Sequence, residues 1–120
     1  MVEVPSKSQQ EMKSYFEEIG EGLRWRNFRD CQKNPFLKKS KLRSQYYRCP
    51  VCKKPLKFGI TSGHHTTYER ICVTDERVKI DGIYMADCES CFGCHTSDFF
   101  ECMHSIVYVH SRCHKKIHEV

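Results

Sequence analysis

Residues 104–120 read HSIVYVHSRCHKKIHEV, which joins a strand pattern, a metal-binding knuckle and a helix pattern in succession. The run IVYV is rich in β-branched and aromatic side chains, which favour strands. Ser111 then stands where a helix N-cap is expected, before a short helix that runs to the end of the chain. His114 and His118 are four residues apart in this helix, so their side chains project from one face. Two imidazoles placed in this way can hold one metal ion.

A second set of ligand residues has the spacing of a structural zinc site. Cys49 and Cys52 enclose two residues in CPVC, and His110 and Cys113 enclose two residues in HSRC. Structural zinc sites use four Cys or His ligands at such spacings, arranged as a tetrahedron. We therefore predict one structural Zn²⁺ bound by Cys49, Cys52, His110 and Cys113. Because Cys113 and His114 are adjacent, their side chains diverge by about 100° in a helix and serve different metal sites.

The composition also favours metal binding. Nine cysteines and seven histidines in 120 residues exceed ordinary usage, and a domain of this size often needs an additional clamp. The odd cysteine count argues against a closed disulfide framework, although a secreted protein with one free thiol stays an alternative. The first 20 residues lack the apolar core of a secretory signal, and no run of about 18 apolar residues could span a membrane. We expect a soluble protein in a reducing compartment, without a membrane partner.

The net charge of +5 is distributed unevenly along the chain. Residues 22–57 contain twelve Lys or Arg and one acid, whereas residues 66–110 contain eight acids and three bases. A basic block suits a protein that binds a phosphate backbone, because neutralising phosphates releases condensed counterions. The alternative is a solvated face that serves solubility. The basic side chains that we expect to contact DNA are Lys38, Lys39, Lys41 and Arg43.

The N-terminal part of the chain has a helical and then a basic character. Residues 6–22 carry apolar side chains at three-to-four spacing, with Ser6 or Ser8 as the cap and glycines at the end. Between residues 23 and 47 bases alternate with aromatics, and Pro35 interrupts any single long helix. We interpret this stretch as a DNA-tracking arm anchored by its aromatics. Among these, Trp25 and Phe28 fit packing better than base stacking.

Residues 56–60 are expected to form a half-buried strand, because Leu56, Phe58 and Ile60 alternate with polar or small residues. This strand would lead directly into the doublet His64 and His65. The zinc site would then hold the start of this strand against the start of the C-terminal helix. We therefore expect the doublet, His114 and His118 to form a single pocket of four imidazoles.

At this point the chain resembles a known family. The motif GHHTTYER at 63–70, followed by a strand and HSRCHKKIHE, is similar to the HNH nucleases of the His-Me (ββα-metal) finger superfamily. The resemblance covers roughly residues 46–120 and is closest to a zinc-containing phage and bacterial subgroup with HHxTYxR and CHxxxH motifs. In this chain His110 replaces the first cysteine of the last knuckle. The resemblance implies an α+β fold, a small zinc-stabilised ββα-metal finger over 46–120, with an N-terminal helical basic extension over 1–45.

The resemblance also implies roles for the histidines. His64, His114 and His118 would hold a catalytic divalent metal, which could be Mg²⁺, Mn²⁺, Ni²⁺ or Zn²⁺. His65 would be the general base that takes a proton from water for in-line attack on phosphorus, while the metal stabilises charge on the phosphate and the leaving oxygen. An unperturbed imidazole, with a pKa of about 6.5, suits a base near neutral pH. Arg70, which matches the last position of the first motif, would contact phosphate.

Two features depart from the family pattern. The middle position, usually Asn or Asp, falls on Ser105 or on His104, and this residue orients the base through the local backbone. The Ser105 hydroxyl can still form hydrogen bonds, although an inactive descendant stays an alternative. The second departure is a Cys-rich insertion, residues 71–102. Its soft ligands could bind a second zinc, or form a loop of reduced, partly buried thiols; they are Cys88, Cys91, Cys94 or His95, and Cys102, with Cys72 in reserve.

These observations predict a metal-dependent DNA endonuclease that nicks or cuts duplex DNA. The resemblance places it in the cytoplasm of a bacterium or a phage-infected cell, and cutting both strands with one site per chain would require a homodimer or two successive nicks. The first alternative is a noncatalytic zinc module that binds nucleic acid or protein. Such a module needs neither an unliganded base nor a second metal set, so His65 and the HxxxH pair favour the enzyme. The second alternative is a secreted nuclease toxin, which would have an immunity partner.

Overall fold

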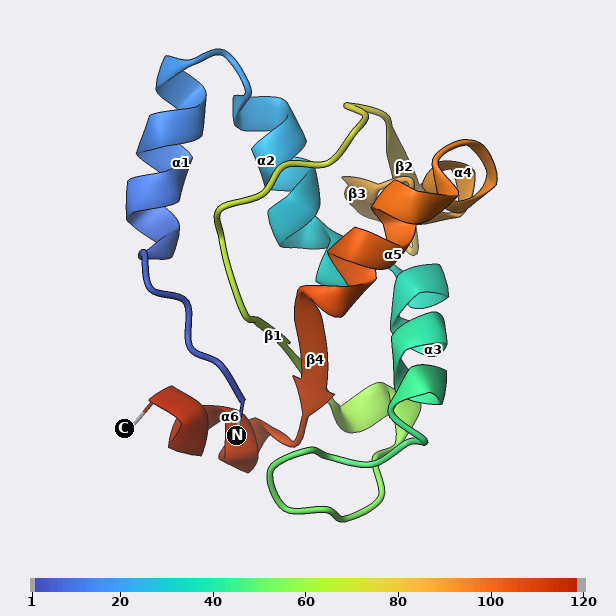
Figure 1. Ribbon diagram of the computed structural model, residues 1–120. Coiled ribbons are helices and arrows are strands. Elements are labelled where there is room, and N and C mark those ends of the chain that lie inside the picture. Colours follow the sequence, from blue (N-terminus) through green and yellow to red (C-terminus); the bar gives the residue numbers. More distant parts are fainter. Residues whose placement is uncertain (1, 119–120) are drawn as a thin grey trace.

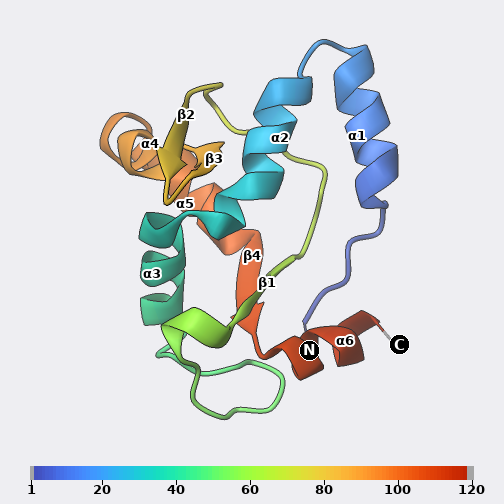
Figure 2. The same ribbon diagram turned by 180° about the vertical axis from the view of Figure 1, so that it is seen from behind.

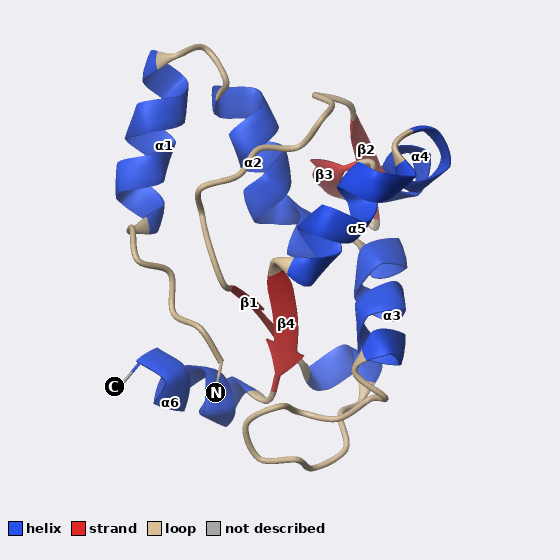
Figure 3. Ribbon diagram, viewed as in Figure 1, coloured by secondary structure: helices blue, strands red, loops and turns tan. Residues whose placement is uncertain are grey.

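Helices dominate the fold, and strands occur in two separate antiparallel pairs (Figure 3). The computed structural model describes residues 2–118, so the end of the predicted C-terminal helix lies outside the described residues. None of the described helices has both the length and the apolar character needed to cross a bilayer. The order is α1 (Gln9–Glu18), α2 (Gly22–Asp30), the 3₁₀ turn η1 (Cys31–Lys33), α3 (Pro35–Ser44), the 3₁₀ turn η2 (Phe58–Ile60), β1 (Ser62–His65), β2 (Arg77–Ile80), β3 (Ile83–Ala86), α4 (Cys88–Cys94), α5 (Thr96–His104), β4 (Ile106–Val109) and α6 (Ser111–His118).

The β1–β4 pair lies at the centre of the domain, and α6 follows β4 directly (Figure 1). The pairing is antiparallel, with His64 opposite Val107 and His65 opposite Ile106. Strand β4 and helix α6 confirm the elements predicted from residues 104–120. Cys113 and Ile117 are the buried side chains of α6.

The predicted strand over residues 56–60 is wrong. Leu56 is buried, but Phe58 and Ile60 are 44% and 61% exposed, and residues 58–60 form the turn η2. The nearest strand, β1, begins only at Ser62. The three alternating apolar side chains therefore do not form the buried face of a strand.

The first helices begin and end where local chemistry dictates. The Ser8 side chain caps α1 by accepting a hydrogen bond from the Glu11 N–H at 3.0 Å. The chain turns at Gly20, whose φ of 81° is accessible to glycine without strain. Asn34 caps α3 by accepting from the Phe36 N–H at 2.9 Å, and Pro35 occupies the first helical position.

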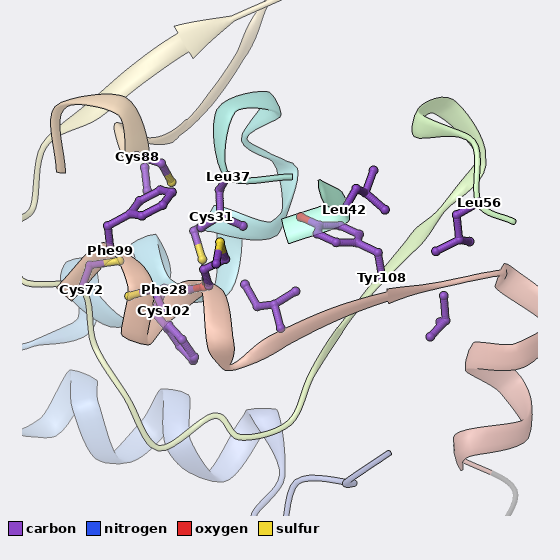
Figure 4. Packing of buried hydrophobic residues seen from close by; sticks show 14 of the residues in the cluster. Phe28, Cys31, Leu37, Leu42, Leu56, Cys72, Cys88, Phe99, Cys102 and Tyr108 are labelled. Atoms are coloured by element: carbon purple, nitrogen blue, oxygen red, sulfur yellow. Dashed lines mark hydrogen bonds between the residues drawn. The ribbon is translucent and has the colours of Figure 1, made fainter. Parts of the chain in front are cut away.

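The basic extension and the C-terminal part share one hydrophobic core (Figure 4). Phe28 from α2 and Leu42 from α3 lie in the same cluster as Phe99 from α5 and Tyr108 from β4. Trp25 and Phe28 are 1% and 0% exposed, which confirms that they serve packing. The extension is therefore an integral part of the domain, and these two aromatics are unavailable for base stacking.

The Cys-rich insertion folds as a hairpin followed by two short helices. Strands β2 and β3 are joined by Asp81 and Gly82, whose φ angles of 51° and 81° match the tight turn that hairpins favour. Helices α4 and α5 then return the chain beside α3 to the start of β4 (Figure 1). Phe36 of α3 packs against Phe92 of α4, with ring centroids 5.5 Å apart.

The one acid of the basic stretch, Asp30, is buried among cations. Its carboxylate lies 3.2 Å from Nη2 of Arg77 and 3.2 Å from Nη2 of Arg29. We predict that Asp30→Ala lowers the free energy of unfolding by about 3 kcal/mol, because it leaves Arg77 partly buried without its counter-charge. Urea denaturation measures this change. The exposed Asp75→Ala is the control, and equal midpoints for the two variants would contradict the prediction.

Candidate metal centres

The four predicted structural zinc ligands lie together. The sulfurs of Cys49, Cys52 and Cys113 and one ring nitrogen of His110 all lie within 4.8 Å of one another. The CPVC turn is closed by its own backbone, because the Lys53 N–H donates to the Cys49 carbonyl at 2.9 Å. We call this set of four ligands the knuckle group. It could hold a zinc ion, as the spacing of the two knuckles predicted.

The surroundings of His110 prepare its ring for a metal. Its Nε2–H donates to the Pro55 carbonyl at 3.1 Å, so Nδ1 carries the lone pair. That Nδ1 lies 3.3 Å from the Cys52 sulfur, inside the knuckle group. A backbone carbonyl that fixes the tautomer of a ligating histidine is a regular feature of metal sites. No pattern in the sequence indicates this contact, because Pro55 acts through its main chain.

The local electrostatics favour the thiolate, the form that binds zinc, at Cys49 and Cys52, whereas burial raises the pKa of Cys113. Burial raises the pKa of Cys49, but backbone N–H groups of the knuckle and the His110 side chain outweigh it, so this pKa falls to about 6. The backbone N–H of Lys54 lowers the pKa of Cys52. The neighbouring Cys49 and Cys52 side chains raise the pKa of His110, as expected beside thiolates.

A second group of three histidines lies between β1 and α6. Their ligand nitrogens also fall within 4.8 Å of one another, and we call them the three-histidine group: His64, His114 and His118. The Nε2 atoms of His114 and His118 are 3.1 Å apart, as expected for residues one turn apart on one helix face. Burial lowers the pKa of both His64 and His114, which favours the neutral ring that binds metal. His118 is exposed, so the three-histidine group is open to solvent on its side.

The N-terminal segment, residues 2–8, reaches the three-histidine group. Figures 1 and 2 both show this segment running between α1 and α6. The Nε2–H of His64 donates to the Glu3 carbonyl at 2.6 Å, which leaves Nδ1 of His64 with the lone pair. No sequence signal predicted this contact, because it joins a backbone carbonyl to a side chain 61 residues away.

The expected pocket of four imidazoles is wrong, because His65 faces away from the other three. Successive side chains of a strand point to opposite faces, so His64 and His65 cannot both face α6. The His65 ring is 2% exposed, stacks on Tyr68 at a centroid distance of 5.1 Å, and meets the Phe28 ring edge-on at 5.0 Å. Its Nε2–H donates to the Phe28 carbonyl at 3.1 Å. Burial lowers the pKa of His65 to about 4.

Ser105 holds Thr66, the residue after the doublet His64 and His65, in place. Its backbone carbonyl accepts from the Thr66 N–H at 2.8 Å and from the Thr66 hydroxyl at 3.1 Å. The Ser105 hydroxyl donates instead to the Glu101 carbonyl, at 3.0 Å. The orienting contact therefore comes from the main chain of Ser105, and the side-chain role expected for this position is not realised. His104, the other residue considered for it, is exposed at the end of α5.

Some of the basic side chains predicted to contact DNA are exposed, and others already contact residues of this chain. Lys39 and Arg43 are exposed on α3. Lys41 is only 8% exposed, so most of its side chain is buried and it is a weaker candidate for a DNA contact than Lys39 or Arg43. Nζ of Lys38 lies 4.8 Å from the centroid of the Phe58 ring. Nη2 of Arg70 lies 2.8 Å from Oε2 of Glu101, in an ion pair that neutralises it.

The predicted second zinc set is not assembled as a group. Among residues 2–118, the knuckle group and the three-histidine group are the sets of three or more ligands that meet the 4.8 Å criterion. Cys88 and Cys102 are buried, whereas Cys94 and the alternative ligand His95 are exposed. The predicted set of Cys88, Cys91, Cys94 and Cys102 therefore combines buried thiols with a thiol that is exposed on α4.

The chain matches no family model, no curated protein and no solved structure. The resemblance to HNH nucleases therefore rests on the motifs quoted above. Function has to be inferred from the geometry of the two metal groups and their surroundings.

Proposed function

We propose that this chain is a metal-dependent DNA endonuclease of the HNH type, with the three-histidine group as its catalytic metal site. The observation that carries the proposal is the ligand count. A structural zinc site is closed by four protein ligands, whereas a catalytic site has three and keeps a position for water or substrate. The knuckle group is of the first kind, and the three-histidine group, exposed at His118, is of the second.

The order of elements supports the same proposal. Strands β1 and β4 pair, α6 follows β4, and the ligands of the three-histidine group come from β1 and α6. The knuckle group ties the stretch before β1 to the start of α6, so that one clamp positions both sources of ligands. A zinc-stabilised ββα-metal finger would have its elements in this order.

The residues fit a divalent metal and a proton acceptor. Three neutral imidazoles suit Zn²⁺, Ni²⁺ and related ions, and an ion held there supplies charge stabilisation to the scissile phosphate and the leaving oxygen. In this proposal Nδ1 of His65 accepts the proton of the attacking water, although the His65 ring is buried on the face of β1 opposite the three-histidine group. The hydrogen bond from Nε2–H to Phe28 leaves Nδ1 with the lone pair, and the low pKa keeps the ring neutral at neutral pH.

The proposed substrate is DNA, and basic side chains near the three-histidine group support this choice. Lys115 and Lys116 are exposed on α6, in the turn that separates His114 from His118. Sequence reasoning missed them as phosphate ligands because it assigned that role to α3. Lysines at this place can bind the phosphates that flank the cleaved bond.

A second candidate function is a noncatalytic zinc module that binds nucleic acid. The burial of His65 favours it, because a base with a pKa of about 4 accepts protons less readily than one matched to neutral pH. In this case the three-histidine group would hold a second structural ion. The two functions differ in whether bound DNA is cut.

Supercoiled plasmid separates these functions. We predict that the wild-type chain nicks plasmid when Mg²⁺, Mn²⁺, Ni²⁺ or Zn²⁺ is added, and that EDTA stops the reaction. His118→Ala should lose nicking by about 100-fold or more, because it removes one of three metal ligands. His95→Ala removes an exposed histidine outside both groups and is the matched control. Plasmid binding without nicking by the wild type in all four metals would establish the zinc module instead.

A further inference from the structure

One buried carboxylate at the end of α2 gathers four cationic side chains around it. The carboxylate of Asp30 lies 3.2 Å from Nη2 of Arg29 and 3.2 Å from Nη2 of Arg77. Nε of Arg26 and Nζ of Lys33 each lie 3.9 Å from it. Among residues 2–118, this carboxylate is the one that lies within 4.0 Å of these four cations. The cluster therefore keeps an excess of positive charge.

The sequence places three of these cations on one helical face. Arg26, Arg29 and Lys33 are three or four residues apart along α2 and η1, the spacing of neighbours on a helix surface. The two outer side chains, Arg26 and Lys33, are 61% and 54% exposed. At 3.9 Å they are too far from the carboxylate for a hydrogen bond. Their N–H donors therefore stay available to an acceptor from outside.

A hollow between α1 and α2 continues this charged surface. The two helices lie side by side in both views (Figures 1 and 2), and the hollow between them has a volume of about 330 Å³. This volume is large enough to admit a phosphate group. One acid, Glu17, contributes to its wall. The residues that line the hollow are Lys13, Glu17, Gly22, Trp25, Arg26 and Arg29.

Two arginines belong both to the hollow and to the cluster around Asp30, so the two features form one surface. We call the cations of this surface the cationic face: Lys13, Arg26, Arg29 and Lys33. Lys13 is exposed on α1, and the other three cations lie on α2 and η1. The cationic face thus spans two elements of the N-terminal extension.

The floor of the hollow is rigid, because Trp25 is buried there. The indole Nε1–H donates to the Tyr68 carbonyl at 2.9 Å, which fixes the ring. The guanidinium carbon of Arg29 lies 5.8 Å from the centroid of this ring, within the range of a cation–π contact. The indole and the Asp30 carboxylate together hold the Arg29 guanidinium in one place. A guanidinium held in this way suits a phosphate oxygen.

The shape of the cationic face favours a chain of phosphates over a single small anion. From Arg26 to Lys33 the cations extend about 10 Å along the helix axis, at about 1.5 Å per residue. A single strand of B-DNA carries one phosphate per about 3.4 Å of duplex axis. A row of cations of this length can therefore contact more than one phosphate of the same strand. Such contacts provide affinity that does not depend on base sequence.

We infer that the cationic face is a binding surface for the phosphate backbone of duplex DNA. Arg26 and Lys33 bind phosphates directly, and Lys13 extends the surface onto α1. Asp30 and Trp25 hold Arg29 in place between them. The choice of DNA as the ligand rests on the proposed function, but binding to this surface does not require cleavage. The surface lies on α1 and α2, whereas the sequence predicted DNA contacts on α3.

Fluorescence anisotropy with two labelled short DNA duplexes of unrelated sequence tests this inference. The full chain is used with its tightly bound metal and without added divalent metal, over a series of salt concentrations. The double variant Arg26→Gln/Lys33→Gln should raise Kd by about tenfold or more and lower the slope of log Kd against log salt by about two. Both duplexes should respond alike. Lys13→Gln, a single change on another helix, should lower the slope by about one.

Lys54→Gln/Lys57→Gln is the matched control, because it removes two exposed cations outside the cationic face. Its Kd should stay within about threefold of that of the wild type, since only long-range attraction is lost. Thermal midpoints equal to that of the wild type report that all variants are folded. Equal weakening in the two double variants would overturn the inference, because net charge alone would then explain binding. Absence of DNA binding by the wild type would overturn it as well.

Plasmid nicking by the same preparations separates this inference from the proposed function. If the wild type binds the duplexes through the cationic face but nicks plasmid with none of the added metals, the nuclease proposal fails and the binding surface stands. If the wild type nicks plasmid and Arg26→Gln/Lys33→Gln binds the duplexes with unchanged Kd and salt slope, the binding surface is wrong and the nuclease proposal stands.

Discussion

Cys49→Ser is expected to leave the chain unfolded at neutral pH in the absence of denaturant. Cys49 is fully buried, and its thiol is the ligand whose surroundings most favour the thiolate. In zinc-finger peptides, a structural zinc ion contributes about 10–16 kcal/mol of folding free energy. The whole domain is expected to be stable by about 5–15 kcal/mol. Loss of this one ligand therefore removes an interaction as large as the total stability.

Far-ultraviolet circular dichroism and the dispersion of amide proton resonances measure this outcome. The wild type should unfold on incubation with a strong zinc chelator and refold when Zn²⁺ is restored. Cys94→Ser is the matched control, because it removes an exposed thiol outside the knuckle group and should leave the spectra unchanged. If the Cys49→Ser chain is folded and has the denaturation midpoint of the wild type, the knuckle group does not stabilise the domain.

The metal groups could be predicted because their ligands are close in sequence. Residues three or four apart face one side of a helix or a tight turn, so CPVC, HSRC and HxxxH fix the relative positions of their members before the chain folds. The pairing of Cys49 with His110 across 61 positions followed from the ligand count, since each knuckle supplies half of a tetrahedron. Short-range geometry and ligand count together were enough for this part of the site.

The positions that depend on distant contacts could not be predicted. Phe58 and Ile60 alternate as strand residues do, yet no neighbouring strand among residues 2–118 pairs with them, and they lie exposed in a turn. The carbonyls of Glu3 and Phe28 fix the rings of His64 and His65, but a carbonyl leaves no mark in a sequence. Cys31 of the basic extension lines a small cavity together with Cys88 and Cys102 of the Cys-rich insertion, although the sequence pattern separated these two parts of the chain.

The opposite orientations of His64 and His65 follow from β1 itself. The doublet motif suggested one pocket for both rings, but a strand directs adjacent side chains to opposite faces. His64 therefore joins α6, and His65 enters the space between α2 and the loop after β1, where Phe28 and Tyr68 enclose it. The catalytic role of His65 is accordingly the part of the proposed function that most needs a direct test.

His65→Gln is expected to reduce the single-turnover nicking rate by about 10²–10⁴-fold, the usual contribution of a general base. Glutamine can still donate to the Phe28 carbonyl that now accepts from the imidazole, so the buried acceptor keeps a partner. The amide cannot accept a proton at neutral pH, and this is the property that the variant removes. The nicking rate, the metal affinity of the three-histidine group and the thermal midpoint should be measured on one preparation.

The three measurements together separate chemistry from structure. A loss of rate with unchanged metal affinity and midpoint assigns proton acceptance to His65, since His64, His114 and His118 still hold the ion. Tyr68→Phe is the matched control: it keeps the ring that stacks on His65 and removes only a hydroxyl, so its rate should stay near that of the wild type. If His65→Gln nicks at the wild-type rate, the imidazole enclosed by Phe28 and Tyr68 is a packing residue and another group must accept the proton.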